Sequence, residues 1–462
     1  MVNQRSLIRT LGVGYVIIFV VANIIGSGVY KKIAPMAAEL GSSGWITLAW
    51  VVGGIITLFG ALSNAEVAGL LADTGGDYVY FKKIYNRFFA FLYGWSLITV
   101  IQTATISSLA WVFAQSLNSI IPLPSVFSPL QDYTMGGVFY PFRDFGIKLA
   151  AIFLIMLLTG LNMTGIKSGA GFSRVILLMV GAGLLIIVIA GLTSGSGRPA
   201  DFMKVSDLTT GSVTLSSFYT AMLAAFWAYQ GWGSVGFIGG EVRDPRKNIP
   251  GGIVIGVFIV ITVYVVVNLT YLSLLSIPQL IQIHESHNQI AAVEAIRSFR
   301  GTTGAVFISV LILITTLSCA HASIVTGARP YYAMARDGLF ISSFGRLNRN
   351  NVPGVSLLWQ GIWASVLVLS GTFDQLTDMI IFAVFIFYGA TAMGVFILRH
   401  RMPDAYRPYK VWGYPVVPAI FILFCIGLFL NTIATRPREA AIGMSLILAG
   451  IPVYYLMNRK KK

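Results

Sequence analysis

The sequence predicts an all-α polytopic membrane protein with twelve transmembrane helices, built as a 5+5 inverted repeat followed by two further helices. Three observations support this fold class. Hydrophobic residues make up 56% of the 462 residues and charged residues only 11%, whereas a soluble domain carries about 25% charged residues. Apolar runs of about the 20 residues that a membrane-spanning helix needs recur along the chain. Two of these runs are interrupted by paired glycines, five helices apart.

The apolar runs define the expected helices. They cover residues 11–38, 43–71, 88–120, 146–165, 171–193, 216–240, 251–277, 302–330, 355–372, 376–398, 413–434 and 440–457. The first run continues past any small-residue cleavage site, so we expect the N-terminal segment to stay on the chain as its own insertion signal. The longest expected external connections are 121–145 and 278–300.

The net charge of +15 is explained by membrane topology. When the helices are threaded from a cytoplasmic N-terminus, 22 of the 32 Lys and Arg residues fall inside and the remaining 10 outside. The positive-inside rule then predicts a multi-pass protein of the cell membrane with both termini in the cytoplasm. We interpret the basic tail at 459–462 as a topology anchor, and we expect the lipid bilayer rather than a nucleic acid as the partner.

Two helices carry a break in mid-membrane. The first break is in "NIIGSGVY" (23–30) and the second in "FWAYQGWG" (226–233). Glycine costs a helix about 1 kcal/mol relative to alanine, and non-helical backbone at membrane depth is tolerated only where it lines a cavity or is covered by protein. The breaks therefore indicate a site inside the membrane.

Matching breaks in helices 1 and 6 are the pattern of an inverted repeat with its substrate site at the repeat interface. We expect residues 1–200 to form the first repeat and residues 201–400 the second. Residues 401–462 are expected to hold helices 11 and 12 and the basic cytoplasmic tail.

The backbone at each break can bind charge. The N–H groups of Gly26, Ser27 and Gly28 begin a half-helix and suit a carboxylate, whereas the carbonyls preceding each break suit an ammonium group. An anion hole beside a cation hole predicts a receptor for an α-amino acid. The expected substrate-binding residues are Ile24, Ile25, Gly26, Ser27, Gly28, Phe226, Trp227, Ala228, Tyr229, Gln230 and Gly231. The alternative is that each glycine pair only permits close helix packing.

Five ordered motifs resemble the amino acid–polyamine–organocation (APC) superfamily, in particular its L-type amino acid transporter branch. They are "NIIGSGVY" (23–30), "GGDYVYFKKIYNRFFAFLYGWSL" (75–97), "FWAYQGWGSVGFIGGEVRDPRKNIP" (226–250), "TGARPYYAMARDGLF" (326–340) and "YRPYKVWGYPVVP" (406–418). The resemblance implies a LeuT-type fold and amino acid transport, often by exchange. Animal members of the branch carry a cysteine in the helix 3–4 loop that links them to a single-span glycoprotein. The loop has no cysteine here, so we expect a prokaryotic-type member without a disulfide-linked ancillary subunit.

Within this resemblance, Lys167 stands where sodium-coupled LeuT-type relatives bind Na⁺. Its ammonium group would brace the helix 1 break against helix 8, which implies sodium-independent transport. Thr315, Ser318 and Cys319 are the candidate partners on helix 8, and the sequence does not choose between them. Two alternatives stay open: Lys167 serves only the positive-inside rule, or it carries a coupling proton.

Aromatic residues surround the second break. The resemblance points to Trp227 as a gate that closes over the substrate, while Tyr229 and Trp232 are weaker candidates. The alternative is ordinary packing, because aromatic side chains on transmembrane helices most often pack or face lipid.

The predicted substrate is neutral. No Asp or Glu lies near either break, and Gln230 directly precedes Gly231. A cationic side chain buried against an amide alone would leave its charge uncompensated, which is costly. We expect Ile24, Ile25, Phe226 and Trp227 to line an apolar side-chain pocket.

The remaining ionisable residues point away from enzyme chemistry. Glu66 and Glu241 are expected to pair with Arg or Lys at an inner gate, with proton coupling as the alternative. His284 and His287 flank Glu285 but lack a fourth metal ligand at usable spacing, so no metal site is expected. No phosphate-binding glycine loop and no nucleophile–base pair is found, so we expect no cofactor, no ATP-driven pump and no enzyme.

The sequence thus predicts a sodium-independent exchanger of neutral L-amino acids that works by alternating access. A proton-coupled symporter with the same site is the alternative within the class. An amino-acid sensor or a substrate-gated channel is the alternative outside it.

Overall fold

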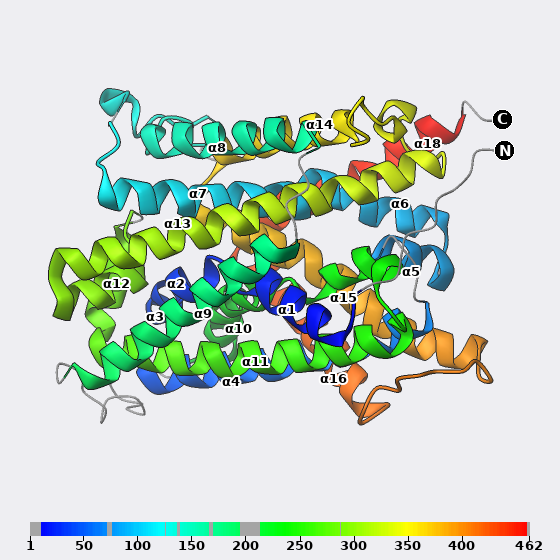
Figure 1. Cartoon of the computed structure of the whole chain (residues 1–462), viewed down its shortest axis with the longest axis horizontal. Helices are drawn as coiled ribbons and strands as arrows, with labels where there is room; N and C mark the ends of the chain where they lie inside the picture. Colours follow the sequence, from blue (N-terminus) through cyan, green and yellow to red (C-terminus); the bar gives the residue numbers. More distant parts are fainter. Residues whose placement is uncertain are drawn as a thin grey trace.

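A computed structural model describes residues 11–71, 76–124, 126–135, 139–165, 170–194, 213–286 and 288–459 of the chain. Over these residues the protein is helical (Figure 1), and pairing of extended segments is limited to two isolated bridges, Leu11–Val242 and Met135–Phe139. The all-α prediction is confirmed for this part of the chain.

The first half of the chain contains both long helices and short ones. They are α1 (Val13–Ile24), α2 (Gly28–Lys31), α3 (Ile33–Leu40), α4 (Ser43–Leu70), α5 (Asp77–Ile84), α6 (Arg87–Ser96), the π-helical turn η1 (Leu97–Ile101), α7 (Gln102–Ile120), the 3₁₀ turn η2 (Ser128–Leu130), α8 (Phe145–Met163) and α9 (Ala170–Thr193).

The second half repeats this mixture. It contains α10 (Leu215–Tyr229), the 3₁₀ helix η4 (Trp232–Glu241), α11 (Pro245–Leu274), α12 (Ile277–Glu285), α13 (Ala291–Arg336), the 3₁₀ turn η5 (Ser342–Gly345), α14 (Gly354–Ser370), α15 (Phe373–Arg401), α16 (Val416–Thr435), α17 (Pro437–Leu448) and α18 (Gly450–Arg459).

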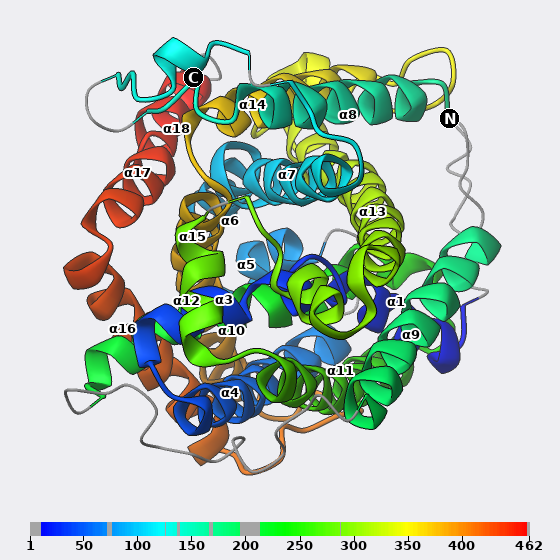
Figure 2. The same cartoon turned by 90° about the vertical axis from the view of Figure 1, so that its left-hand side faces the viewer.

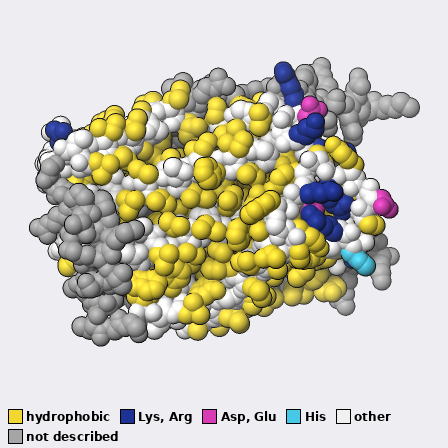
Figure 3. Space-filling model, turned by 90° about the horizontal axis from the view of Figure 1, so that it is seen from below, with side chains coloured by type: hydrophobic (Ala, Val, Ile, Leu, Met, Phe, Trp, Pro, Cys, Tyr) yellow, Lys and Arg dark blue, Asp and Glu magenta, His cyan; other side chains and the backbone are white. Residues whose placement is uncertain are grey.

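The chain is a multi-pass membrane protein. Within the described residues, eight helical segments are long and apolar enough to cross a membrane, and three shorter apolar helices accompany them, at Val13–Ile24, Leu177–Thr193 and Gly354–Ser370. Figure 3 shows apolar side chains covering one flank of the molecule, with charged side chains gathered toward one end. That distribution suits a surface surrounded by lipid and bounded by water.

Every residue range that was predicted to be a transmembrane helix contains helical residues. The predicted and observed helices differ mainly in where they begin and end. Helix α11 begins at Pro245 instead of residue 251, because proline is well tolerated in the first turn of a helix. Residues 291–300 are also helical, and Gly301, with φ +60°, interrupts α13 just before the expected start at 302. Helix α5 lies in a segment where no helix was expected, since it is too short and polar to span a membrane.

The two broken helices lie in the middle of the bundle. Figure 2 shows α1 among α9, α11 and α13, and α10 among α3, α4, α15 and α16. Because the longer, continuous helices form the surrounding wall, the irregular backbone of the breaks is covered by protein. This satisfies the condition for non-helical backbone at membrane depth.

Ion pairs tie the helices together at both ends of the bundle. At the proximal end, where α1 begins and α13 and α15 finish, Glu66 pairs with Arg399 at 2.7 Å and Lys82 pairs with Asp337 at 2.7 Å. At the opposite, distal end, Lys32 of α3's N-cap pairs with Asp374 of α15 at 2.6 Å. The functional site lies between these two sets of contacts.

Candidate functional site between the two broken helices

The first break separates α1 from α2. Helix α1 ends at Ile24 and α2 begins at Gly28, with Ile25, Gly26 and Ser27 between them, all buried. The carbonyl of Ile24 accepts a hydrogen bond from the hydroxyl of Tyr264 at 2.9 Å. A carbonyl has two lone pairs, so one acceptor position on Ile24 is already used by the protein.

The second break separates α10 from η4. Helix α10 ends at Tyr229, Gln230 is extended, and Gly231 has φ +127°. A side chain on Gly231 would collide with the carbonyl oxygen of Asn23, in the last turn of α1. Glycine is therefore required at 231 both by its backbone angle and by the close approach of the other broken helix.

The glycines of the first break have different surroundings. A Cβ built on Gly28 would lie 2.5 Å from the Cα of Ala228, so α2 and α10 touch through their backbones. A Cβ built on Gly26 would meet nothing closer than 3.7 Å, and its nearest neighbours are Leu109 and Cys319. Close packing therefore accounts for Gly28 and Gly231, whereas a Cβ at Gly26 would meet its neighbours at ordinary van der Waals distance, and Gly26 lines a cavity.

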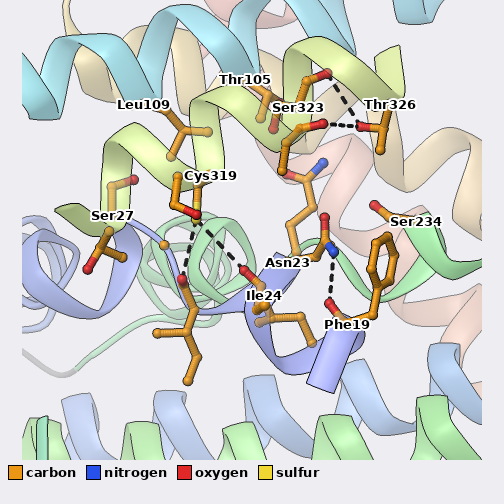
Figure 4. A pocket seen from close by; sticks show the side chains of 18 of the residues that line it. Phe19, Asn23, Ile24, Ser27, Thr105, Leu109, Ser234, Cys319, Ser323 and Thr326 are labelled. Atoms are coloured by element: carbon orange, nitrogen blue, oxygen red, sulfur yellow. Dashed lines mark hydrogen bonds between the residues drawn. The ribbon is translucent and has the colours of Figure 1, made fainter. Parts of the chain in front are cut away.

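This cavity has a volume of about 150 Å³ and lies between the breaks, α7, α9 and α13 (Figure 4). This volume is below the range typical of drug-sized ligands and suits a small molecule. Eight of the eleven residues expected to bind substrate line it. They are Ile24, Ile25, Gly26, Ser27, Gly28, Trp227, Gln230 and Gly231.

Three expected residues do not line the cavity. Phe226 packs on Phe385, with ring centroids 4.5 Å apart, and is directed away from the site. Tyr229 donates from its hydroxyl to the carbonyl of Trp50 at 3.0 Å. Ala228 is the surface on which Gly28 packs. On a helix, neighbouring residues point about 100° apart, so one stretch of α10 cannot direct every side chain to the same cavity.

Sequence reasoning missed most of the wall that α7 and α13 supply. Gln102, Thr105 and Leu109 come from α7, and Ala322, Ser323 and Thr326 join the expected residues on α13. Tyr15, Phe19 and Asn23 add one face of α1. The signal was present in α13, because Thr315, Ser318, Cys319, Ala322, Ser323 and Thr326 follow the 3- and 4-residue spacing of one helix face.

The cavity has both apolar and polar walls and is uncharged. Among the described residues, no acidic or basic side chain lines it. The amide oxygen of Gln230 is buried and has no hydrogen-bond partner in the part of the chain that the structure describes. Gln230 is one of the residues that line the cavity.

With this geometry established, comparison with known proteins identifies the family. A model of the amino acid permease family matches residues 11–457. The chain belongs to the amino acid permease family. The permease is 28% identical to the serine/threonine exchanger SteT of Bacillus subtilis over 464 residues, which cover 99% of each chain.

Two mammalian proteins are similar over most of their length. The permease is 27% identical to the large neutral amino acids transporter small subunit 2 of Mus musculus, over 95% of its own chain and 78% of that protein. It is 26% identical to the human b(0,+)-type amino acid transporter 1, over 99% of its own chain and 90% of that protein. The matches confirm an APC-type, L-type-like transporter and exclude an enzyme.

Trp227 lies against the first break. Its indole Nε1 donates to the Ser27 hydroxyl at 3.3 Å, and its ring meets Phe373 of α15 edge-on at 6.1 Å. The ammonium groups of Lys31 and Lys32 also lie over the Phe373 ring, each 4.7 Å from the ring centroid. Trp227 therefore separates the cavity of the permease from the ion pairs of the distal end.

Helix α13 contacts the first break through one of its candidate residues. The Cys319 Sγ lies 3.5 Å from the carbonyl of Ile25. Thr315 donates to the carbonyl of Leu311 at 2.7 Å and lies 3.4 Å from the Tyr30 hydroxyl, and Ser318 lines the cavity. Lys167, their expected partner, lies outside the described residues.

Glu66 joins three segments at the proximal end. Its carboxylate accepts from Arg399 at 2.9 and 2.7 Å and from the backbone N–H of Val411 at 2.7 Å, and Arg407 lies 3.4 Å away. The contacts join the end of α4 to the end of α15 and to the segment after it. Glu241 ends η4, and its side chain lies outside the described part of the chain.

A second proximal acid, Asp77 of α5, escaped the sequence analysis. The carboxylate accepts a hydrogen bond from the Tyr93 hydroxyl at 3.2 Å and lies beside Gly233 of η4. Burial raises the pKa of Asp77 to about 7, although the hydrogen bond from Tyr93 opposes the rise. The sequence pattern that could have identified Asp77 is an acidic residue next to paired glycines, between two apolar runs.

Proposed function

We propose that the permease exchanges neutral L-amino acids across the cell membrane by alternating access, without sodium. The observation that carries the proposal is the uncharged cavity bounded by both helix breaks. An α-amino acid carries a carboxylate and an ammonium group in every case, so a receptor built from backbone donors and acceptors suits the whole class. The activities for which the three relatives are named, all amino acid transport or exchange, agree with it.

We also propose a LeuT-type arrangement of twelve transmembrane helices in two inverted repeats, at residues 1–200 and 201–400. The support is the pair of broken helices at matching positions and their contact through Gly231 and Asn23. The excess of basic residues on the N-terminal side supports cytoplasmic termini. In this orientation the proximal end faces the cytoplasm and the distal end faces outside.

The proposed binding mode assigns a role to each break. The substrate carboxylate approaches the N–H groups of Gly26, Ser27 and Gly28, where the half-helix formed by α2 and α3 begins. The ammonium group approaches the free acceptor positions at the carbonyls of Ile24 and Ile25. Trp227 closes the distal side, and Gln230 lies beside the substrate side chain. Rocking of helices 1, 2, 6 and 7 of the proposed fold against the other helices then opens the proximal side.

Lys167 takes the place of a sodium ion in this proposal. A fixed cation between the first break and α13 would hold the two elements as a bound ion does, and Cys319 marks the point where they meet. Replacing Lys167 by Met is expected to abolish exchange with no gain of sodium dependence. Transport that survives in the variant would contradict this role.

Proton-coupled symport is a second candidate, favoured by Asp77. A buried carboxyl with a pKa of about 7 changes its proton occupancy near cytoplasmic pH, and its contact with η4 links it to the second break. This candidate predicts uptake into empty vesicles under an inward proton gradient, with Asp77→Asn losing that dependence.

The test is uptake of labelled serine, leucine and arginine into sodium-free proteoliposomes, either preloaded with amino acid or empty. Exchange predicts strong serine or leucine uptake into preloaded vesicles only. Uptake into empty vesicles driven by a proton gradient would replace exchange by symport. Preferred arginine uptake would contradict the neutral substrate, and the absence of saturable flux would favour a sensor or a channel.

A further inference from the structure

A second cavity lies at the distal end, outside the substrate site. It has a volume of about 170 Å³ and is bounded by the end of α14, the first turns of α15 and one face of α17. Its walls are mostly aliphatic or aromatic. They include Trp363, Leu367, Leu376, Met379, Ile442 and Leu446. An apolar space of this kind favours a hydrocarbon ligand.

This cavity opens to the flank of the bundle that a membrane surrounds. Val366, on its wall, is 45% exposed, and Phe139, which reaches it from the connection between α7 and α8, is 41% exposed. Figure 2 shows α14 and α17 as separate outer elements, with the α7–α8 connection passing near both. The opening and the loop above it suit a chain that enters from the bilayer.

The rim of the cavity carries one charge of each sign. Arg438 and Glu439, in the first turn of α17, both line it, with Nη1 and Oε1 3.8 Å apart. Both side chains are largely buried, with 24% and 12% of their surface exposed. A guanidinium group next to a carboxylate complements a headgroup that carries both a phosphate and an ammonium group.

The same turn of α15 also carries the contacts of the distal end. Gln375, Leu376 and Met379 face the cavity, while Asp374 and Thr377 each accept from the Lys32 ammonium group at 2.6 Å. A ligand in the cavity would therefore press on the back of the turn that holds the half-helix after the first break in place.

We propose that this cavity binds a phosphatidylethanolamine molecule of the distal leaflet. One acyl chain lies between α14, α15 and α17 beneath Phe139. The phosphate group lies at Arg438 and the ammonium group at Glu439. The bound lipid supports the first turn of α15 and so stabilises the closed distal end.

The test is native mass spectrometry of the purified full chain with equal amounts of phosphatidylethanolamine, phosphatidylglycerol and phosphatidylcholine. Retention of phosphatidylethanolamine at least fivefold above the other two is expected. Ile442→Trp, which fills the cavity, and Arg438→Gln, which removes the phosphate partner, should each lower that retention at least fivefold. Leu448→Trp is the matched control, because Leu448 is 48% exposed on α17 and does not line the cavity.

Equal retention of the three lipids by the wild-type chain would overturn the proposal, as would unchanged retention in either cavity variant. Monodisperse elution identifies any variant that fails to fold, and Arg438→Gln then provides the test alone. Because the readout is lipid binding, it is independent of whether the permease proves to be an exchanger.

Discussion

The two helix breaks meet in the same cavity but are built differently. At the first, a methyl group added to Gly26 would meet nothing closer than 3.7 Å, which is an ordinary contact distance, and only Gly28 packs tightly. The second has Gly231 at φ +127°, pressed against the carbonyl of Asn23. The first break therefore borders the cavity with room for a ligand, whereas the second holds the two broken helices in register.

The largest effect is expected at Gly231. Replacing it by Ala adds a Cβ where the Asn23 carbonyl already lies and forces a residue with a side chain into a backbone conformation that costs about 1–3 kcal/mol. We expect at least a tenfold loss of serine counterflow together with a lower yield of folded protein. A variant with normal yield and normal counterflow would show that the second break is not rigid.

Gly28→Ala should have the next largest effect, and Gly26→Ala is its matched control. The added methyl group at 28 overlaps Ala228, and such overpacking costs about 1–3 kcal/mol. Thermal unfolding in detergent should show a lower midpoint for Gly28→Ala and an unchanged midpoint for Gly26→Ala. Counterflow should fall in both, in Gly26→Ala because the methyl group enters the cavity. Equal unfolding midpoints for the two variants would show that Gly28 is packed no more tightly than Gly26.

Gln230→Glu tests what the second break contributes to selectivity. A carboxylate in an otherwise uncharged cavity would compensate a cationic side chain that the amide leaves unpaired. We expect arginine to gain at least tenfold over serine in competition for counterflow. An unchanged order of substrates would mean that Gln230 does not face the substrate side chain.

Ser27→Ala is expected to have the smallest effect. It removes the acceptor for the Trp227 indole, a hydrogen bond worth about 1 kcal/mol, which corresponds to roughly fivefold. The KM for serine should rise by about that factor while the yield stays normal. An unchanged KM would show that the hydrogen bond between Trp227 and Ser27 does not contribute to substrate binding.

The helices and both breaks could be predicted because their signals are local. Apolar runs and paired glycines act through nearest neighbours on one helix, so every expected range contains helix. The predicted helix boundaries were less accurate, as at Pro245, because a helix end is determined by single capping residues. Helix α5 escaped detection because it crosses no membrane.

The site was predicted only where it lies on the breaks themselves. The wall made by Gln102, Thr105 and Ser323 depends on how α7 and α13 pack around α1, and a single sequence does not contain that packing. The same reason explains why Tyr229 was expected at the substrate, although its hydroxyl bonds to Trp50 instead. The sequence shows where a helix breaks, and tertiary packing decides which side chains face the gap.

The central claim is that the two breaks bind the carboxylate and the ammonium group of the substrate. The direct measurement is competition for serine counterflow by ethanolamine, which lacks the carboxylate, and by 3-hydroxypropanoate, which lacks the ammonium group. Neither compound is expected to compete at concentrations where unlabelled serine and threonine do. Competition by either compound at the concentration of serine would contradict it, because recognition would then rest on the side chain alone.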